Sequence, residues 1–321
     1  MLKRFTVFMS ALYMALALAP LAVKARLNDK EGNETQTAMA ADTAAEQMPA
    51  AEPEEEYSYK FDELEDYVTG VVAAEMPASF NEEALKAQAV CARTYAIRYM
   101  EESGSLSVPY DIYQAYCTVD EMRAKWGDNF DTYYAKVKGA VKATEGEIML
   151  YNDEPVLAVF HSMSGGKTEN SENIWGGETD YLKSVDSSFD EDSPGFIVST
   201  ALDTEYVKAK LKEAEPTISF GGGNIISVAE RTEAGYVKTV KAGDKTFTGK
   251  QIRELLGLRS ANFTVEERDG KTVFTTKGFG HGAGMSQYGA NHMAEDGSGY
   301  RGILSHYYTG VEIAKIKIRV E

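Results

Sequence analysis

The sequence predicts an α+β fold in which helices and antiparallel hairpins surround a buried central helix. Small and apolar residues recur at helical spacing between residues 79 and 104 and cover most of that helix's circumference, which is typical of a helix packed on more than one side. Turn residues at positions 152–153 and 269–270 predict hairpins. Two glycine-rich polar loops lie at residues 161–168 and 278–290, and binding groups tend to collect on such loops.

The first 27 residues are not expected to join this fold. Lys3 and Arg4 precede an apolar run from Phe5 to Val23, and positive charge before such a run predicts export of the rest of the chain. A run of about 20 residues is also long enough to span a bilayer. Residues 1–27 are therefore either a signal peptide or a membrane anchor, and the length of the run favours the anchor.

Residues 28–60 are predicted to be a disordered acidic linker, because they are rich in Ala, Glu, Thr and Gln and contain few large apolar side chains. Residues 28–66 carry 2 basic and 13 acidic side chains, and so hold much of the net charge of −17. No basic stripe is present, which argues against a nucleic-acid ligand. Residues 61–321 are expected to form the globular part of the chain, and their number allows one large domain or two modest ones.

The first predicted helix, Asp62 to Ala74, leads into Glu75, which is the candidate catalytic acid. Pro77 disfavours helical backbone at Met76, so Glu75 should lie at a helix C-terminus. The negative end of the helix dipole and the apolar neighbours both penalise the charged carboxylate and should raise its pKa.

The next helix is the predicted central one. Ser79 and Glu82 have the spacing of a capping box, and the apolar pattern continues to Gly104. Arg93 inside such a helix requires a partner, which could be Glu75, another carboxylate or a ligand. Alternatively, its side chain extends from the helix edge into solvent.

The remaining elements are predicted from periodicity and turn residues and are interpreted largely as scaffold. We expect a helix at Phe130–Thr144, a hairpin of Glu147–Tyr151 with Val156–Phe160, a helix at 203–214, strands at Ile225–Ala229 and Tyr236–Val240, a helix at Gly249–Leu256, a hairpin turning at Asp269-Gly270, and a helix at Met285–Ala294.

The two glycine-rich loops are H-S-M-S-G-G-K-T, residues 161–168, and G-F-G-H-G-A-G-M-S-Q-Y-G-A, residues 278–290. Glycines let a backbone approach a ligand closely and expose N–H donors. The first loop lacks the full phosphate-loop spacing. Trp175 and Tyr181 follow it, and sugar rings stack on such aromatic side chains, although a tryptophan such as Trp175 is more often a core residue than a stacking platform.

Several chemistries lack a signature. Four scattered histidines and two cysteines do not have zinc-site spacing. The serine-hydrolase motif G-x-S-x-G is absent, and no second acid stands in a motif beside Glu75, although paired carboxylates remain possible. Cys91 and Cys117 could form a disulfide outside the cell, or could both be small buried thiols.

Five motifs, in this order, resemble the stage II sporulation protein D family. They are Y-V-T-G-V-V-A-A-E-M-P, A-L-K-A-Q-A-V-C-A-R-T-Y, F-H-S-M-S-G-G-K-T-E-N, W-G-G-E-T-D-Y-L-K-S-V, and the 278–290 loop followed by I-L-S-H-Y-Y-T-G. The resemblance runs from about residue 61 to the C-terminus.

This resemblance implies a lytic transglycosylase that cuts peptidoglycan strands from which stem peptides have been removed, during engulfment of the forespore. The glutamate of the family's E-M-P motif matches Glu75, which would act as both acid and base and leave 1,6-anhydro ends. The loops and Tyr181 would line the glycan groove, and the burial argument adds Arg93. The expected substrate-binding residues are Arg93, His161, Ser162, Ser164, Gly165, Gly166, Thr168, Tyr181, His281, Met285, Ser286, Gln287 and Tyr288.

The implied partners are a sporulation amidase, a membrane scaffold protein and the glycan itself, with the catalytic domain outside the membrane. Some family members hold zinc in the segment that corresponds to Asp111–Val119, but this chain has only Cys117 there, so we predict no metal and no cofactor. Two alternatives remain: a non-catalytic wall-binding enhancer of an amidase, and a glycan hydrolase.

Overall fold

The computed structural model describes residues 61–103 and 114–316, so the predicted anchor and linker lie outside the described residues. The helices are α2 (Phe61–Glu75), α3 (Glu82–Ser103), α4 (Val119–Trp126), α5 (Phe130–Ala143), α6 (Ser171–Trp175), α7 (Thr204–Ala214), α8 (Gly249–Leu256), α9 (Gln287–Glu295) and α10 (Tyr300–Tyr307), with short 3-10 turns η3 (Gly127–Asn129) and η4 (Ser188–Asp192). The strands are β1 (Glu147–Tyr151), β2 (Glu154–Pro155), β3 (Phe160–His161), β4 (Ile197–Asp203), β5 (Ile226–Arg231), β6 (Val237–Ala242), β7 (Lys245–Thr248), β8 (Phe263–Arg268), β9 (Lys271–Lys277), β10 (Met285–Ser286) and β11 (Glu312–Lys315).

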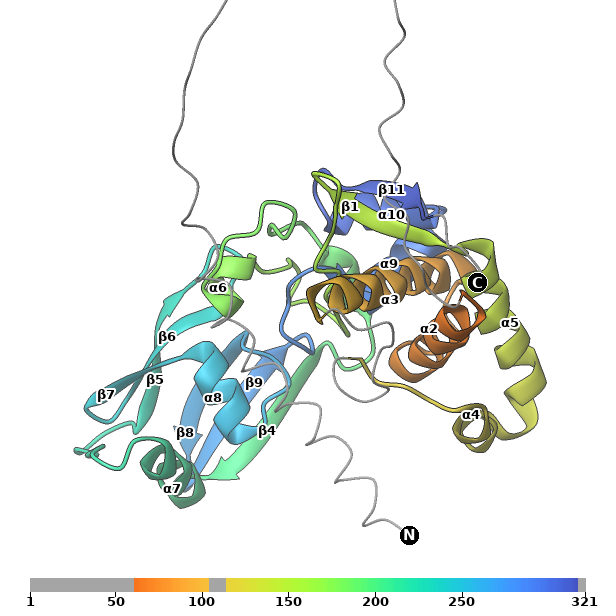
Figure 1. Ribbon diagram of the computed structural model, residues 1–321. Coiled ribbons are helices and arrows are strands. Elements are labelled where there is room, and N and C mark those ends of the chain that lie inside the picture. Colours follow the sequence, from red (N-terminus) through yellow and green to blue (C-terminus); the bar gives the residue numbers. More distant parts are fainter. Residues whose placement is uncertain (1–60, 104–113, 317–321) are drawn as a thin grey trace, which may run out of the picture.

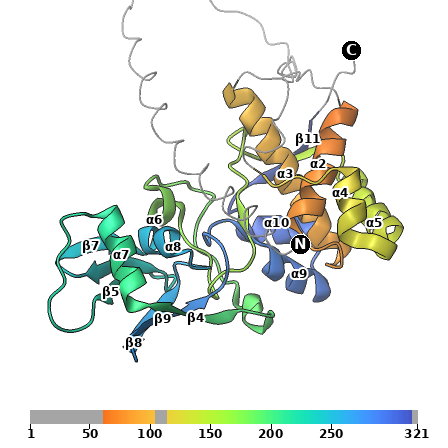
Figure 2. The same cartoon turned by 90° about the horizontal axis from the view of Figure 1, so that it is seen from below.

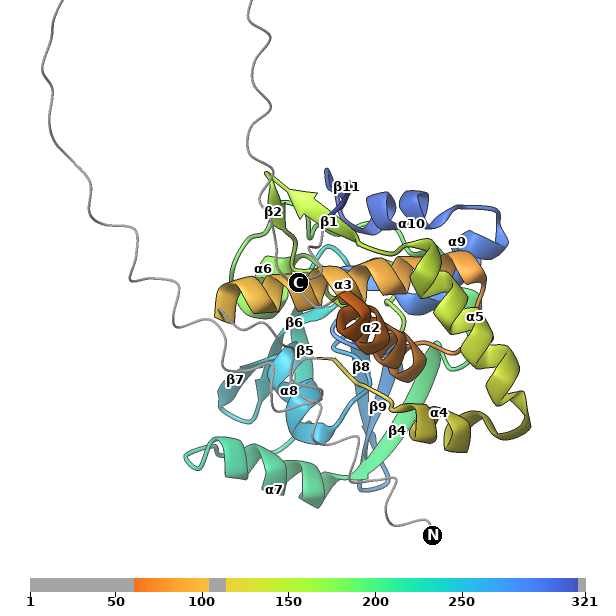
Figure 3. The ribbon, with the colours of Figure 1, turned by 45° about the vertical axis from the view of Figure 1, so that its right-hand side comes forward.

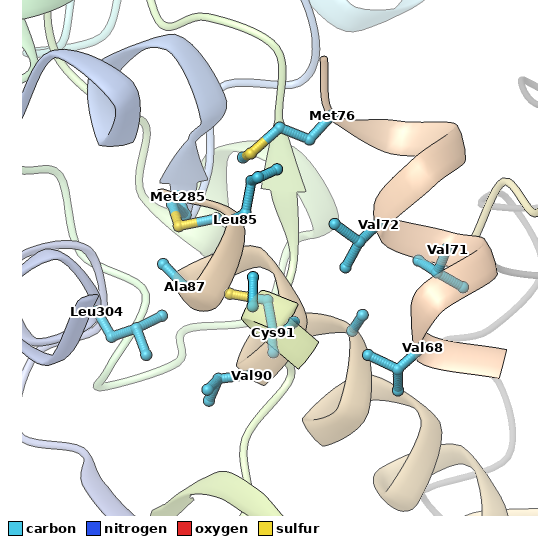
Figure 4. Close-up of a cluster of buried hydrophobic side chains, with 14 of the residues drawn as sticks. Val68, Val71, Val72, Met76, Leu85, Ala87, Val90, Cys91, Met285 and Leu304 are labelled. Carbon is cyan, nitrogen blue, oxygen red and sulfur yellow. The ribbon is translucent and has the colours of Figure 1, made fainter. Parts of the chain in front are cut away.

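Helix α3 is the centre of the larger hydrophobic core, which confirms the predicted α+β fold around a buried helix. It packs against α2, α5, α9, α10 and β1 (Figure 1). Its alanines allow these neighbours to approach on several sides. Figure 4 shows Val68, Val71 and Val72 of α2 on one side of α3, and Met285 and Leu304, from the C-terminal part of the chain, on the other side.

The start of α3 differs from the prediction. Asn81, rather than Ser79, caps the helix: its side-chain oxygen accepts a hydrogen bond from the N–H of Glu83 at 3.0 Å, and its carbonyl accepts one from Leu85 at 3.1 Å. Asn is as good a cap as Ser, and the Pro77–Phe80 turn places Asn81 at the point where the helix begins.

The first hairpin turn is confirmed, but its second strand is much shorter than predicted. Asn152 and Asp153 both have positive φ, 53° and 63°, as a two-residue turn of this kind requires. Strand β2 ends at Pro155, and the chain then enters the core. Strand β3 does not continue the hairpin. It pairs in parallel with β10, which comes from the second glycine-rich loop.

Residues 197–277 form a second unit, which we call the sheet lobe; the other described residues form the helical lobe. The sheet lobe contains two three-stranded sheets, β4-β9-β8 and β5-β6-β7, with α7 and α8 packed against them over their own hydrophobic core. Figure 2 shows this lobe beside the helical lobe. The turn at Asp269-Gly270 is confirmed between β8 and β9, whereas β4 was missed, because every second residue of it is exposed and the rest are only half-buried.

The two glycine-rich loops lie where the chain passes between the lobes. The N–H of Gly278, at the end of β9, donates to the carbonyl of Phe196 just before β4. Farther along the boundary, the Glu169 carboxylate accepts a hydrogen bond from Thr232 of the sheet lobe at 2.5 Å. Figure 3 shows α3 crossing behind α2, with the strands of the sheet lobe below.

Within residues 61–103 and 114–316, no helix is both long and apolar enough to cross a membrane. The candidate anchor, residues 1–27, is not among these residues.

Candidate active site

Glu75 is the last residue of α2, as predicted, and its carboxyl group is partly buried. The backbone N–H of Ala115 donates a hydrogen bond of 2.7 Å to Oε1. Burial raises the pKa of Glu75 to about 7, while the Ala115 hydrogen bond and the positive charge of Lys125 act in the opposite direction. A carboxyl group with this pKa is populated in both protonation states near neutral pH, so it can donate a proton and later accept one.

Gln287 links the second glycine-rich loop to the backbone of Glu75. Its amide N–H₂ donates to the main-chain carbonyl of Glu75 at 3.1 Å and to the side-chain oxygen of Gln88 on α3 at 3.2 Å. Gln88 is fully buried, and its own amide nitrogen has no hydrogen-bond partner among the residues that the structure describes. The structure therefore brings together Glu75 and Gln287, two residues that are 212 positions apart.

Two lysines, one from α4 and one from α5, bind backbone carbonyls of the segment 73–80, where the chain turns from α2 into α3; we call this segment the Glu75 corner. Lys125 donates to the carbonyls of Ala73 at 2.8 Å and Ala74 at 3.4 Å. Lys136 donates to the carbonyl of Phe80. Carbonyls at the end of a helix lack partners within the helix, and a nearby positive charge complements the negative end of the dipole. The sequence did not single out either lysine, because nothing local connects them to Glu75.

The two glycine-rich loops bind each other through their backbones. Met163 and Phe279 exchange backbone hydrogen bonds of 3.0 and 2.7 Å, and the N–H of Tyr288 donates to the carbonyl of Ser162 at 3.0 Å. Gly284 has a φ of +67°, and a Cβ there would lie 2.0 Å from the carbonyl oxygen of Val159. The glycines therefore permit close packing between segments of the chain itself.

A buried carboxylate that the sequence did not reveal fixes both loops. Asp190, fully buried in η4, accepts hydrogen bonds from the hydroxyls of Ser164 at 2.7 Å, Ser187 at 2.9 Å and Ser286 at 2.7 Å. The N–H of Ser164 adds a further bond of 2.9 Å. The predicted substrate contacts of Ser164 and Ser286 are therefore replaced by structural ones, since both hydroxyls are used and both side chains are buried.

Both histidines of the loops are held neutral. His161 is 4% exposed and its Nδ1 lies 3.0 Å from the carbonyl of Ala283; burial lowers its pKa to about 4. His281 has Nε2 2.9 Å from the carbonyl of Phe160, and burial together with His161 lowers its pKa well below the usual value. Because a carbonyl only accepts, each ring donates there as a neutral tautomer. His161 is a packing residue, whereas His281 keeps partial exposure.

Arg93 does not reach Glu75 or the surface, which corrects its interpretation as a substrate-binding residue. Its side chain is 0% exposed and makes two hydrogen bonds to the Glu65 carboxylate, at 2.7 and 2.6 Å. A third goes to the carbonyl of Glu147 at 3.0 Å. The partner is therefore another carboxylate, one of the alternatives left open, because Glu65 faces α3 from the opposite end of α2.

Other expected contacts are also buried. The Tyr181 hydroxyl accepts from the N–H of Leu157 at 2.8 Å, Thr168 is fully buried, Gly166 is enclosed, and Met285 lies in the core (Figure 4). Among the predicted substrate-binding residues, those that keep partial exposure are Ser162, Gly165, His281 and Tyr288. Tyr288 follows Gln287, and its ring packs edge-on against Phe80 with centroids 5.0 Å apart, which places it at the Glu75 corner.

The cysteines are not paired with each other. Cys91 is buried with its sulfur 3.4 Å from the Tyr308 hydroxyl, and Cys117 is partly buried. Burial raises the pKa of the Cys117 thiol. In the part of the chain that the structure describes, no three His, Cys, Asp or Glu side chains gather in a group that could hold a metal ion; residues 111–113 of the Asp111–Val119 segment are not described.

A hollow of about 360 Å³ lies between α2, α4 and α5. Its lining comes from Asp66, Tyr67, Thr69, Tyr116, Val119, Met122, Tyr134 and Lys138. Tyr116 connects it to the Glu75 corner, because it directly follows Ala115, whose N–H binds the carboxyl group. The glycine-rich loops do not line it.

Comparison with known proteins gives a consistent family. A family model described as stage II sporulation protein matches residues 58–151. Stage II sporulation protein D of Bacillus amyloliquefaciens is 40% identical over 260 residues, covering 78% of this chain and 74% of the relative. The protein of the same name from Bacillus subtilis is 39% identical with the same coverage. An amidase enhancer of Bacillus subtilis is 29% identical over 294 residues, covering 76% of this chain and 40% of the relative.

Proposed function

Because the chain belongs to the stage II sporulation protein D family, we propose that it is a lytic transglycosylase that cleaves denuded peptidoglycan glycan strands during sporulation. The observation that carries the proposal is the Glu75 carboxyl group, fixed by Ala115 at a helix end and with a pKa raised to about 7 by burial. The same environment would be unfavourable for a carboxylate that served only to bind a cation or to remain ionised.

The reaction needs one carboxyl group used twice. Protonated Glu75 donates its proton to the glycosidic oxygen, and the bond between C1 of N-acetylmuramic acid and that oxygen breaks. The oxygen of the C6 hydroxyl of the same sugar then bonds to C1, and the Glu75 carboxylate takes the hydroxyl proton. The products are a free 4-hydroxyl end and a 1,6-anhydro end, no water is consumed, and Glu75 returns to its protonated form.

The charges around Glu75 support a single-acid mechanism over a hydrolase with two catalytic carboxylates. In the described part of the chain, the groups that shift the pKa of Glu75 are Ala115 and Lys125, neither of which is an acid. Asp190 is buried and fully engaged by serine hydroxyls, so it is unsuited to activating a water molecule.

In this proposal the substrate contacts are partly exposed side chains near the Glu75 corner. Tyr288 offers a partly exposed ring beside Phe80, and Ser162 and His281 lie on the adjoining loops. Sugar rings pack their apolar faces on aromatic side chains, with hydroxyls bound by polar groups. We further propose a location in the cell envelope, with residues 1–27 as the anchor, and the amidase that removes stem peptides and a membrane scaffold as partners.

The proposal is tested by identifying the chemical structure of the glycan ends that cleavage produces. The purified protein is incubated with denuded glycan strands and the products are analysed by mass spectrometry; 1,6-anhydro ends are expected. Glu75→Gln should abolish cleavage with an unchanged circular dichroism spectrum, whereas Glu82→Gln, on the exposed first turn of α3, should cleave normally. Reducing ends would replace the proposal with a hydrolase, and cleavage by the Glu75→Gln variant would remove Glu75 from the mechanism.

A second function is favoured by one relative, the amidase enhancer. A protein of that kind would bind the wall and stimulate a partner without cutting glycan. The same preparation, mixed with a peptidoglycan amidase and intact wall, distinguishes the two: stimulation that survives in Glu75→Gln, combined with no glycan cleavage by the unaltered chain, would support the enhancer.

A further inference from the structure

Lys125 meets the catalytic helix at the residues immediately before Glu75. Its ammonium group lies 2.8 Å from the carbonyl oxygen of Ala73 and 3.4 Å from that of Ala74. Lys125 belongs to α4, which follows directly from the Ala115–Thr118 segment that binds the Glu75 carboxyl group. One continuous stretch of chain thus contacts both the side chain of Glu75 and the backbone of its helical turn.

The position of Lys125 is built into α4 rather than being a chance orientation of a surface side chain. The helix begins with a complete capping box between Thr118 and Glu121. The Arg123 guanidinium lies over the Phe130 ring, 4.1 Å from its centroid, which ties α4 to α5. A helix fixed at its start and along its length presents Lys125 to α2 at small entropic cost.

The groups around Glu75 come from several elements. Among the groups of the described residues that interact with Glu75, Lys125 is the cation. The hydroxyl of Tyr67 on α2 and the thiol of Cys117 both interact electrostatically with Glu75. From α9 and α3, Gln287 and Gln88 contribute neutral amides. Burial favours the uncharged form of the Glu75 carboxyl group, and the positive charge of Lys125 acts against this effect.

We propose that Lys125 is a positioning residue of the reaction, which holds the last turn of α2 and supplies the positive charge that stabilises the ionised form of Glu75 once its proton has passed to the glycosidic oxygen. This inference rests on the proposed function. A single carboxyl group must be protonated when the glycosidic bond breaks and ionised when the C6 hydroxyl loses its proton. Burial alone supports the first state; the ammonium group supports the second without contacting the substrate.

The direct test is titration of Glu75 itself, followed through its side-chain carboxyl carbon by NMR in the full-length protein. In Lys125→Met the pKa of Glu75 is expected to rise by roughly 0.5 to 1 unit, because an opposite charge nearby has been removed. Lys125→Arg keeps the charge and should titrate like the unaltered chain. Lys136→Met is the matched control: it removes an ammonium group from a carbonyl of the same corner, but Lys136 is not among the charges that act on Glu75.

Two further readouts separate charge from simple structural support. Because Lys125 is exposed, the difference between Lys125→Met and the unaltered chain should shrink markedly at about 1 M salt. In glycan cleavage, Lys125→Met should lower kcat with little change in KM and move the alkaline limb of the pH profile upward by the same roughly 0.5 to 1 unit.

The outcomes are distinguishable from failure of the proposed function. An unchanged Glu75 titration in Lys125→Met, or an equal shift in Lys136→Met, would overturn the role of Lys125 whether or not the chain cuts glycan. Cleavage by Glu75→Gln would overturn the proposed function, and with it the catalytic meaning of a titration shift.

Discussion

Replacing Arg93 by Met should strongly destabilise the fold without changing the affinity for glycan. Arg93 is 0% exposed and Glu65 15% exposed, and the pair is joined by hydrogen bonds of 2.6 and 2.7 Å. Removing one member of such a pair leaves the other charge uncompensated in a poorly solvated position. The carbonyl of Glu147, which accepts from Arg93 at 3.0 Å, also loses its donor.

The magnitude follows from this burial. Breaking a buried pair by removing one partner typically costs about 3 to 5 kcal/mol. For a chain of this size each kcal/mol corresponds to roughly 2 to 4 °C, so Arg93→Met should unfold roughly 6 to 20 °C lower. The pair between Arg98 and Glu102 is partly exposed, and Glu102→Gln is the control, expected to cost below about 0.5 kcal/mol.

The assay is urea and thermal unfolding followed by circular dichroism, with glycan KM measured well below the transition. The double variant Arg93→Met/Glu65→Gln should be less destabilised than the two single changes added together, because no unpaired charge remains. A loss below about 1 kcal/mol in Arg93→Met, or a raised KM in a fully folded sample, would refute the structural assignment and return Arg93 to the substrate site.

Three other predictions concern stability. The pKa of Glu75 is raised from 4.5 to about 7, so its contribution to the free energy of unfolding is present below pH 4.5 and is lost as the pH rises through 7. Between pH 4 and 8 the unaltered chain should therefore lose about 3 kcal/mol of stability relative to Glu75→Gln. Equal pH dependence of the two proteins in urea unfolding would contradict this. Gly284→Ala should destabilise the fold by more than about 2 kcal/mol, since its Cβ would lie 2.0 Å from the Val159 carbonyl oxygen. The control is Gly139→Ala on α5, where a Cβ would meet open space; in thermal unfolding it should stabilise the fold by about 0.5 to 1 kcal/mol. Asp190→Ala should cost roughly 3 kcal/mol and expose both glycine-rich loops to proteolysis; unchanged protease resistance would argue against its anchoring role.

Elements specified by nearby residues were predicted well. Helix α8 has the predicted bounds, α2 is one residue longer than predicted at each end, and α5 is one residue shorter at its C-terminus. The turns at Asn152-Asp153 and Asp269-Gly270 were also found, because their backbone angles suit only a few residue types. Strand β4 was missed, since its exposed edge position leaves no alternating apolar pattern.

The glycine-rich loops were located from the sequence, but the contacts that many of their residues make within the chain were not predicted. Glycine indicates that something approaches the backbone closely, and the sequence cannot state whether that is a ligand or another part of the chain. Here it is the chain: His161 binds the carbonyl of Ala283, 122 residues away, and Ser164 and Ser286 share Asp190. No local pattern marks Asp190 as their common partner.

Local sequence patterns specified most of the longer helices, the two hairpin turns and the position of Glu75 at a helix end, because periodicity, capping and proline act over a few residues. Helix α4, which carries Lys125, was not predicted. Which groups lie around that carboxyl group depends on tertiary packing: Ala115 and Lys125 belong to one stretch of chain packed beside the end of α2, and Gln287 comes from α9. The same holds for Arg93, whose need for a partner could be read locally, whereas Glu65 was selected by the packing of α2 on α3. Burial and charge depend on contacts between distant segments, and these set the pKa on which the proposed chemistry of Glu75 depends.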